Sequence, residues 1–111
     1  MLLLFIQGNK MKISLNKLPL DYINDVNKAV NILKSAGCSE IYIFGSLVSG
    51  LYKKTSDIDL AVKGLPKKIF FKISGKLMME LEHRFDLVEL DDEDNNFSKF
   101  ILENEVFIRV A

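Results

Sequence analysis

The chain lacks several sequence features that would by themselves identify its class of protein. Its 111 residues include one cysteine, Cys38, which excludes an intramolecular disulfide, and we expect a reducing, cytoplasmic location. Its 15 basic and 15 acidic residues cancel, so composition predicts no general affinity for nucleic acid or for an anionic membrane. The apolar run that begins at Met1 ends at Gln7, far short of a membrane span. Any phosphate chemistry must therefore come from a local arrangement of residues.

What the chain does have is 49% hydrophobic residues in a length that suits one compact domain. We predict a single domain over residues 13–111 and an N-terminal extension or short strand over residues 1–12. The extension has neither a basic flank nor a small-residue cleavage site, so it does not resemble a signal peptide. The sequence contains no repeat and no low-complexity segment.

The spacing of apolar residues predicts an α+β fold, with a small mixed β-sheet and helices packed on one face. Apolar residues three and four positions apart predict helices over residues 20–36, 67–83 and 97–104, with a short helix at 46–52. Short runs rich in β-branched and aromatic residues predict strands over 40–44, 57–62, 85–90 and 106–110. Residues 91–96 are predicted to form a polar break.

The most informative stretch lies between the first two predicted strands. The first strand ends at Gly45 and Ser46, and Asp57 and Asp59 stand two positions apart in the next strand. Because alternate side chains of a strand share a face, both carboxylates are expected to point the same way. Adjacent carboxylates repel each other unless a cation neutralises them, and Mg²⁺ accepts oxygen ligands of this kind. The pair therefore predicts a metal site.

A third acid and a phosphate-binding turn complete the predicted site. Catalysis with two metal ions requires a further carboxylate, and Asp86 begins an apolar strand in which an acid has no structural reason to be. Gly45 allows close approach of the backbone to a phosphate, and the Ser46 hydroxyl and the following amides are suitable donors to its oxygens. The turn differs from the Walker loop, because no Gly-Lys-Ser/Thr sequence is present.

This pattern resembles the signature of the DNA polymerase beta-like nucleotidyltransferase superfamily: Gly-Ser, ten residues, Asp-Ile-Asp, then an acid in a later strand. The size is similar to that of its minimal nucleotidyltransferases, of the MntA-like antitoxin type. The resemblance implies a polymerase beta-like palm fold and ATP as the substrate, with its triphosphate held by Gly45 and Ser46. It also implies two Mg²⁺ ions held by Asp57, Asp59 and Asp86, the last of which also helps to deprotonate the acceptor hydroxyl.

The implied reaction is Mg²⁺-dependent transfer of AMP from ATP to a hydroxyl group. The length leaves no room for an acceptor domain, and proteins of this type are paired with a small helical HEPN-domain protein in toxin–antitoxin systems. We therefore expect a HEPN-type partner that carries the acceptor. Two alternatives stay open: a weakly active or inactive antitoxin-like subunit that neutralises its partner by contact, and a small-molecule nucleotidyltransferase that shares its pocket with a second chain. Formation of a homo-oligomer also stays open.

The chain departs from the family pattern just after Ser46. Many minimal members carry arginine one and three places after the serine, where this chain has Leu47 and Ser49. Lys53 and Lys54 in the following loop are candidates to supply the nucleotide with the missing positive charge. We interpret the single histidine, His83, as structural, because the predicted end of a helix favours a positive group.

Overall fold

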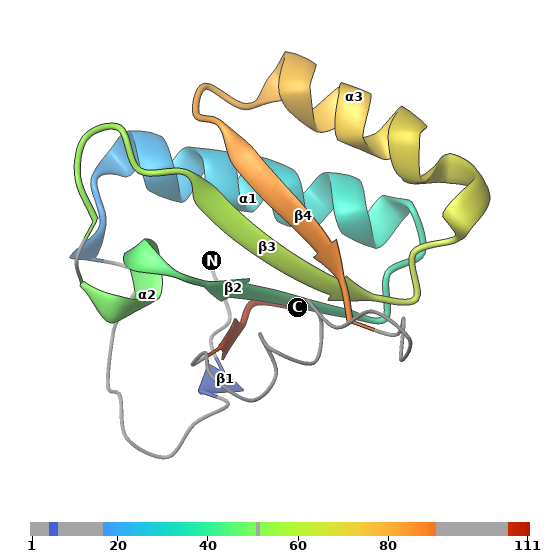
Figure 1. The fold of residues 1–111 in the computed structure, drawn as a ribbon, viewed down its shortest axis with the longest axis horizontal. Coiled ribbons are helices and arrows are strands. Elements are labelled where there is room, and N and C mark those ends of the chain that lie inside the picture. The colour runs from blue at the N-terminus through green and yellow to red at the C-terminus, as the bar shows by residue number, and fades with distance from the viewer. Residues whose placement is uncertain (1–4, 7–16, 51, 91–106) are drawn as a thin grey trace.

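The structure is a computed structural model that describes residues 5–6, 17–50, 52–90 and 107–111. Two long helices lie on the same side of a sheet (Figure 1). The elements in chain order are β1 (Phe5–Ile6), α1 (Leu20–Ser35), β2 (Glu40–Phe44), α2 (Ser46–Ser49), β3 (Ile58–Lys63), η2 (Lys67–Ile69), α3 (Phe70–Glu80), β4 (Phe85–Glu89) and β5 (Ile108–Arg109).

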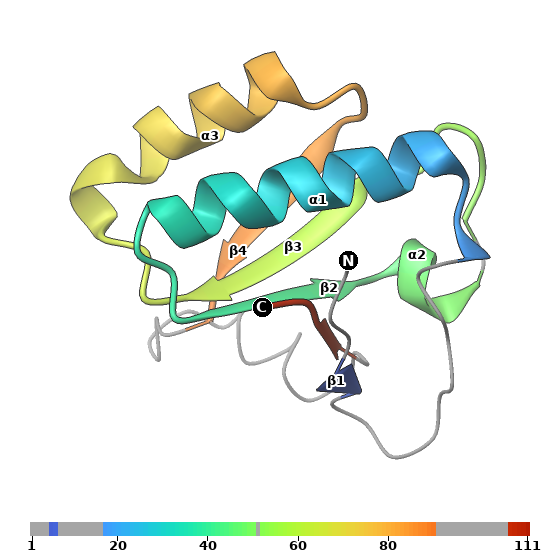
Figure 2. The same ribbon diagram turned by 180° about the vertical axis from the view of Figure 1, so that it is seen from behind.

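The described strands form one mixed sheet in the order β1-β5-β2-β3-β4. Strand β2 pairs antiparallel with β3 and with β5, and β1 pairs antiparallel with β5. Strands β3 and β4 are parallel, so the chain between them must cross over, and α3 forms that crossover. The view from behind shows α1 and α3 side by side over one face (Figure 2). The predicted α+β fold with helices on one face is confirmed.

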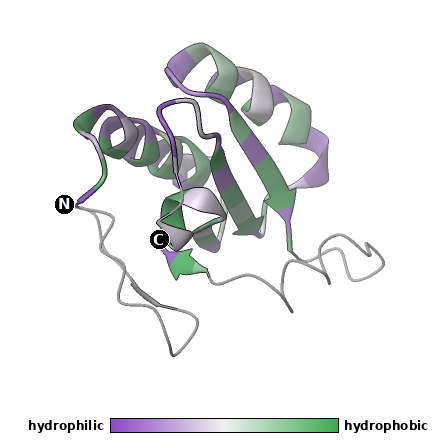
Figure 3. Cartoon of the chain, turned by 60° about the vertical axis from the view of Figure 1, so that its left-hand side comes forward, coloured by the Kyte–Doolittle hydropathy of each residue, from purple (hydrophilic) through white to green (hydrophobic). Residues whose placement is uncertain are grey.

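Alternation along the strands gives the sheet two different faces. Figure 3 shows hydrophobic bands along the strands and along both long helices. The helix-covered face contributes fully buried residues to the main core, namely Ile41, Ile43, Ile58, Leu60 and Val62. The opposite face carries a smaller cluster of Tyr42, Phe44, Ala61, Val88, Leu90 and Phe107. Because β3 alternates, the odd-numbered Asp59 lies on the face of Ala61, away from the helices.

The first long helix begins after Pro19 and ends before Gly37, close to the predicted bounds. Gly37 has φ of +104°, a conformation that side chains disfavour. The N–H groups of Gly37 and Cys38 donate to the carbonyls of Lys34 and Leu33, at 3.0 and 3.1 Å. This Schellman motif ends the helix and directs the chain into β2.

Several predicted boundaries are wrong by a few residues. The short helix α2 ends at Ser49, because Gly50 takes φ of +84° and its N–H donates to the Ser46 carbonyl. The helix predicted over 67–83 begins as the 3-10 helix η2 and ends at Glu80, because Leu81 has extended backbone. The predicted helix 97–104 and the polar break 91–96 lie outside the described residues.

Strand β1 lies within the predicted N-terminal extension and pairs with β5, Phe5 opposite Arg109. The division between residues 12 and 13 stays a prediction, because it lies outside the described residues. Within the described ranges, no helix combines the length and the apolar character needed to cross a membrane.

Candidate active site

Gly45 and Asp59 are in direct contact at the end of β2. Gly45 has φ of +78°, and a Cβ built on it would lie 2.0 Å from Oδ2 of Asp59. Strand pairing explains the contact, because Phe44 of β2 is opposite Asp59 of β3. Ser46 follows as the first residue of α2. The structure thus brings the predicted Gly-Ser turn and one predicted acid together through a position that only glycine fits.

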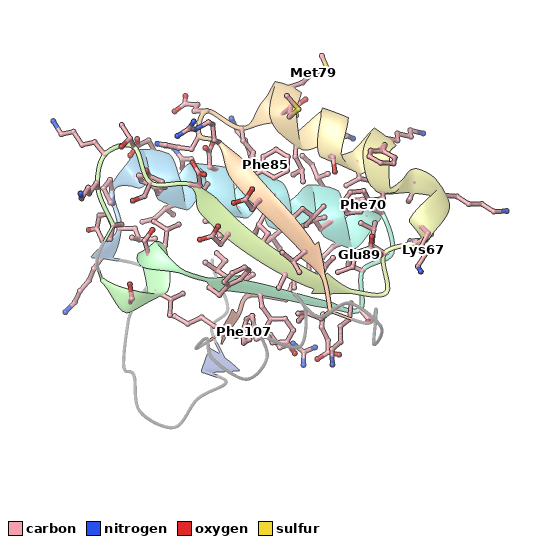
Figure 4. The ribbon with its side chains drawn as sticks, viewed as in Figure 1. Lys67, Phe70, Met79, Phe85, Glu89 and Phe107 are labelled. Carbon is pink, nitrogen blue, oxygen red and sulfur yellow. The ribbon has the colours of Figure 1, made fainter. Side chains whose placement is uncertain are left out.

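Strands β3 and β4 bring the predicted acids to one face of the sheet. In the parallel register Asp59 is opposite Asp86. Alternation places Asp57 on the same face, whereas the intervening Ile58 is fully buried in the main core. Phe85 marks the start of β4 in Figure 4, and it is this end of the strand that carries Asp86. Asp57 and Asp59 therefore share a sheet face with Asp86 of the next strand, and Asp59 also lies beside Gly45.

Arg84 joins this face, although the sequence analysis assigned it no role. Its Nε lies 3.2 Å from Oδ1 of Asp57, and its carbonyl accepts a hydrogen bond of 2.9 Å from the N–H of Ile58. Because Ile58 is opposite Phe85, the preceding residues Asp57 and Arg84 also lie side by side. The signal in the sequence was that Arg84 stands two residues before Asp86. Residues two apart in a strand lie on the same face.

The three carboxylates suit a divalent cation chemically, but they do not converge in the structure. Among the described residues, no three His, Cys, Asp or Glu side chains form a group that could hold a metal ion. Oδ1 of Asp57 is buried and accepts no hydrogen bond from the described part of the chain, and its cationic neighbour there is the Arg84 guanidinium, whose Nε lies 3.2 Å away. A metal ion held by Asp57 would take the place of that guanidinium as its counter-charge. Neighbouring strands are only about 4.8 Å apart, so Asp59 and Asp86 need only side-chain rotation to reach one ion. The donor set fits Mg²⁺.

Tyr22 of α1 holds the loop that leads to Asp57. Its hydroxyl donates to the Ser56 carbonyl at 2.7 Å and lies 3.3 Å from the carbonyls of Lys53 and Lys54. Burial raises the pKa of Tyr22, and the negative charges of nearby acids raise it further. The phenol therefore keeps its proton and remains a donor. Tyr22, which is not one of the predicted site residues, thus fixes the loop that precedes Asp57.

His83 is structural, but the predicted reason is wrong. It follows α3 in a turn, and its partners are acids of α1 rather than the end of its own helix. Its Nδ1 lies 2.7 Å from Oδ2 of Asp25, and its Nε2 lies 3.1 Å from Oδ2 of Asp21. Asp25 is 1% exposed and also accepts the backbone N–H groups of Glu82 and His83, at 3.0 and 2.8 Å. Helix α1 thus fixes the turn before β4.

Replacement of Asp25 by alanine is expected to lower the free energy of unfolding by about 3–4 kcal/mol. The change leaves two backbone N–H groups and the His83 ring without their acceptor. Urea unfolding of Asp25→Ala measures the loss. Asn24→Ala is the matched control, because Asn24 is an exposed neighbour on the same helix, and its effect should stay within about 0.5 kcal/mol. A loss below about 1 kcal/mol for Asp25→Ala would show that the turn does not depend on this carboxylate.

Lys53 and Lys54 are exposed and line a pocket of about 540 Å³. The other lining residues are Pro19, Asp21, Tyr22 and Tyr52, and none of the predicted acids is among them. Binding of the nucleotide by the two lysines therefore stays a prediction. Leu47, the residue after Ser46, is 1% exposed and packs in the main core. Helix α2 contains no basic residue, so the Gly-Ser turn has no cation in its own helix.

A mixed sheet with helices on one face, and with carboxylates on the other beside a Gly-Ser turn, defines a nucleotidyltransferase-type palm domain. The chain belongs to the family described as "Polymerase beta, Nucleotidyltransferase", whose model matches residues 27–109. Comparison with curated proteins finds no significant match. The predictions of the family and of the palm fold are confirmed.

The chain is also similar to solved toxin–antitoxin structures. It is 28% identical to a chain of a toxin–antitoxin complex with AMP-PNP, with 74% of this chain and 69% of that chain covered and a TM-score of 0.58. A mutant toxin–antitoxin complex matches at 26% identity, with the same coverage and a TM-score of 0.55. The complex MntA–HepT matches at 24% identity, with coverage of 78% and 69% and a TM-score of 0.53, and supports the fold alone.

Proposed function

We propose that this protein is a Mg²⁺-dependent nucleotidyltransferase that transfers AMP from ATP to a hydroxyl group of a HEPN-type partner protein in a toxin–antitoxin pair. The observation that carries the proposal is the contact of Gly45 with Asp59, which is itself opposite Asp86 on the sheet face away from the helices. Family membership supports the reaction type. Similarity to a toxin–antitoxin complex with AMP-PNP supports the nucleotide and the partner.

Each residue has a defined task in the proposed site. The backbone at Gly45 and the hydroxyl of Ser46 bind phosphate oxygens of ATP. Asp57, Asp59 and Asp86 would hold two Mg²⁺ ions, which would supply positive charge for the triphosphate and for the leaving pyrophosphate. Asp86 is exposed at the start of β4, so an acceptor that approaches from solvent can reach it.

The proposed reaction is one displacement at phosphorus. The acceptor oxygen forms a bond to the α-phosphorus of ATP, while the bond from that phosphorus to the oxygen that bridges to the β-phosphate breaks. Pyrophosphate leaves with the bonding electrons, and the carboxylate of Asp86 accepts the hydroxyl proton. The product is a phosphodiester between AMP and the partner protein.

Radiolabelled ATP tests the proposal directly. The purified protein is incubated with Mg²⁺ and with a HEPN-type protein encoded by the neighbouring gene. Label at the α-phosphate should appear on the partner, whereas label at the γ-phosphate should not, and EDTA should abolish the transfer. If the neighbouring gene encodes no HEPN-type protein, or if no α-label reaches the partner under any Mg²⁺ concentration, the proposed reaction is wrong.

A second candidate function is neutralisation of the partner by contact alone. Two observations favour it: buried Leu47 replaces an arginine of the family pattern, and the described acids do not converge on a common ion. The double variant Asp57→Asn/Asp59→Asn separates the two functions. If the double variant still neutralises the partner in growing cells, contact is sufficient; if neutralisation is lost while the complex still forms, the transfer reaction is required.

A further inference from the structure

The parallel pairing of β3 and β4 gives Arg84 a defined place on the face of the acids. Asp57 and Arg84 stand one residue before the paired Ile58 and Phe85, and Asp59 and Asp86 stand one residue after them. Alternation sends all four side chains to the same face of the sheet. The 3.2 Å approach of the Arg84 Nε to Oδ1 of Asp57 agrees with this placement. One guanidinium thus shares a sheet face with three carboxylates and is paired with one of them, Asp57.

The backbone of Arg84 is fixed from both sides. Its carbonyl accepts the N–H of Ile58 at 2.9 Å. The preceding residue, His83, donates its N–H to buried Asp25 at 2.8 Å, and its ring stacks on Tyr22 with ring centres 3.8 Å apart. Arg84 therefore extends from a backbone that is already held in place, so binding of a ligand costs little additional backbone entropy.

The side chain of Arg84, in contrast, is 82% exposed. An exposed ion pair of this kind contributes little to the stability of a fold, so its pairing with Asp57 does not by itself explain an arginine at this position. Arginine binds phosphate well, because its planar guanidinium donates two parallel hydrogen bonds to phosphate oxygens. A long exposed cation on a rigid base, on the sheet face that carries the acids, is suited to an anionic ligand.

We propose that Arg84 binds the triphosphate of the nucleotide and supplies the positive charge that helix α2 lacks. In the free protein its guanidinium neutralises Asp57. A metal ion held by Asp57 would replace the guanidinium as its counter-charge, and Arg84 would then be free to donate to the phosphate oxygens. The inference rests on the proposed nucleotidyltransferase function and extends it to a residue that the Gly-Ser and Asp-Ile-Asp pattern does not include.

Calorimetric titration of the full chain with a non-hydrolysable ATP analogue and Mg²⁺ tests this role. Arg84→Ala should weaken binding of the analogue about tenfold to a hundredfold. Arg84→Lys should recover part of the loss, because lysine keeps the charge but not the two parallel donors. Lys72→Ala removes one exposed positive charge from α3 and should change the affinity less than twofold.

Binding of Mn²⁺ alone separates ligand binding from a structural role. Loss of Arg84 removes a cation beside Asp57, so Arg84→Ala should bind Mn²⁺ as tightly as the wild type or more tightly. A variant with a collapsed site would instead bind both the metal and the analogue more weakly, and this result would overturn the role of Arg84. If the wild type binds the analogue and Arg84→Ala binds it equally well, only this inference is wrong; if the wild type binds no analogue with Mg²⁺, the proposed function is wrong with it.

Discussion

Asp59→Asn is expected to lower the rate of AMP transfer about a thousandfold, which corresponds to about 4 kcal/mol of activation free energy. Asparagine keeps the size of the side chain that contacts Gly45 but removes the charge that would hold Mg²⁺. The measurement is the initial rate of transfer of α-labelled AMP to the partner at saturating ATP. Because asparagine has nearly the same shape as aspartate and still fits against Gly45, the thermal unfolding midpoint of Asp59→Asn should differ from that of the wild type by only a few degrees.

Glu80→Gln is the control for this prediction. Glu80 is an exposed acid at the end of α3, and its replacement removes the same charge from the chain. The rate of transfer should then stay within twofold of the wild type. A rate for Asp59→Asn within tenfold of the wild type would mean that Asp59 does not hold the metal, and the candidate site would have to be reassigned.

Gly45→Ala is expected to reduce transfer at least a hundredfold with a smaller effect on stability. A methyl group at this position would lie 2.0 Å from Oδ2 and 3.0 Å from Cγ of Asp59, so the carboxylate must rotate away. The positive φ adds a conformational cost of about 1–2 kcal/mol. The displaced carboxylate impairs catalysis, whereas the backbone strain lowers the free energy of unfolding.

Gly50→Ala separates these two effects. Gly50 has φ of +84°, but a Cβ there would have no atom within 4 Å. Gly50→Ala should therefore carry the backbone cost alone and keep the transfer reaction, whereas Gly45→Ala should lose more stability in urea unfolding and should also lose the transfer reaction. Equal activity of the two variants would contradict the assignment of the contact between Gly45 and Asp59 to catalysis.

The sequence predicted those features of the fold that depend on near neighbours. The alternation of Ile58 and Leu60 with Asp57 and Asp59 is local, so the face of the acids followed from β3 alone. The end of α1 followed from Gly37, because a left-handed residue after a helix is a local requirement. The end of the second long helix was wrong, because apolar Leu81 continues the helical spacing while its backbone is already extended.

The features that the sequence did not predict depend on distant pairing. The partner of His83 is Asp25, 58 positions earlier, and no local pattern relates the two residues. The place of Arg84 depends on the register between β3 and β4, which the sequence of either strand leaves open. The role of Tyr22 depends on the loop that holds Ser56, which lies 34 positions later. Long-range contacts thus add residues to a candidate site whose other members were proposed from local sequence.

The parallel register of β3 with β4 has a consequence for how the protein can fail. A slip of β3 by one residue would turn Asp57 and Asp59 into the apolar layer under the helices and would expose Ile58 and Leu60 to water. Such a misaligned chain would bury unpaired charges, so it would unfold rather than persist as a folded but inactive protein. A register slip of this strand would therefore remove the fold and the activity together. A folded variant without activity must owe its defect to the chemistry of individual side chains.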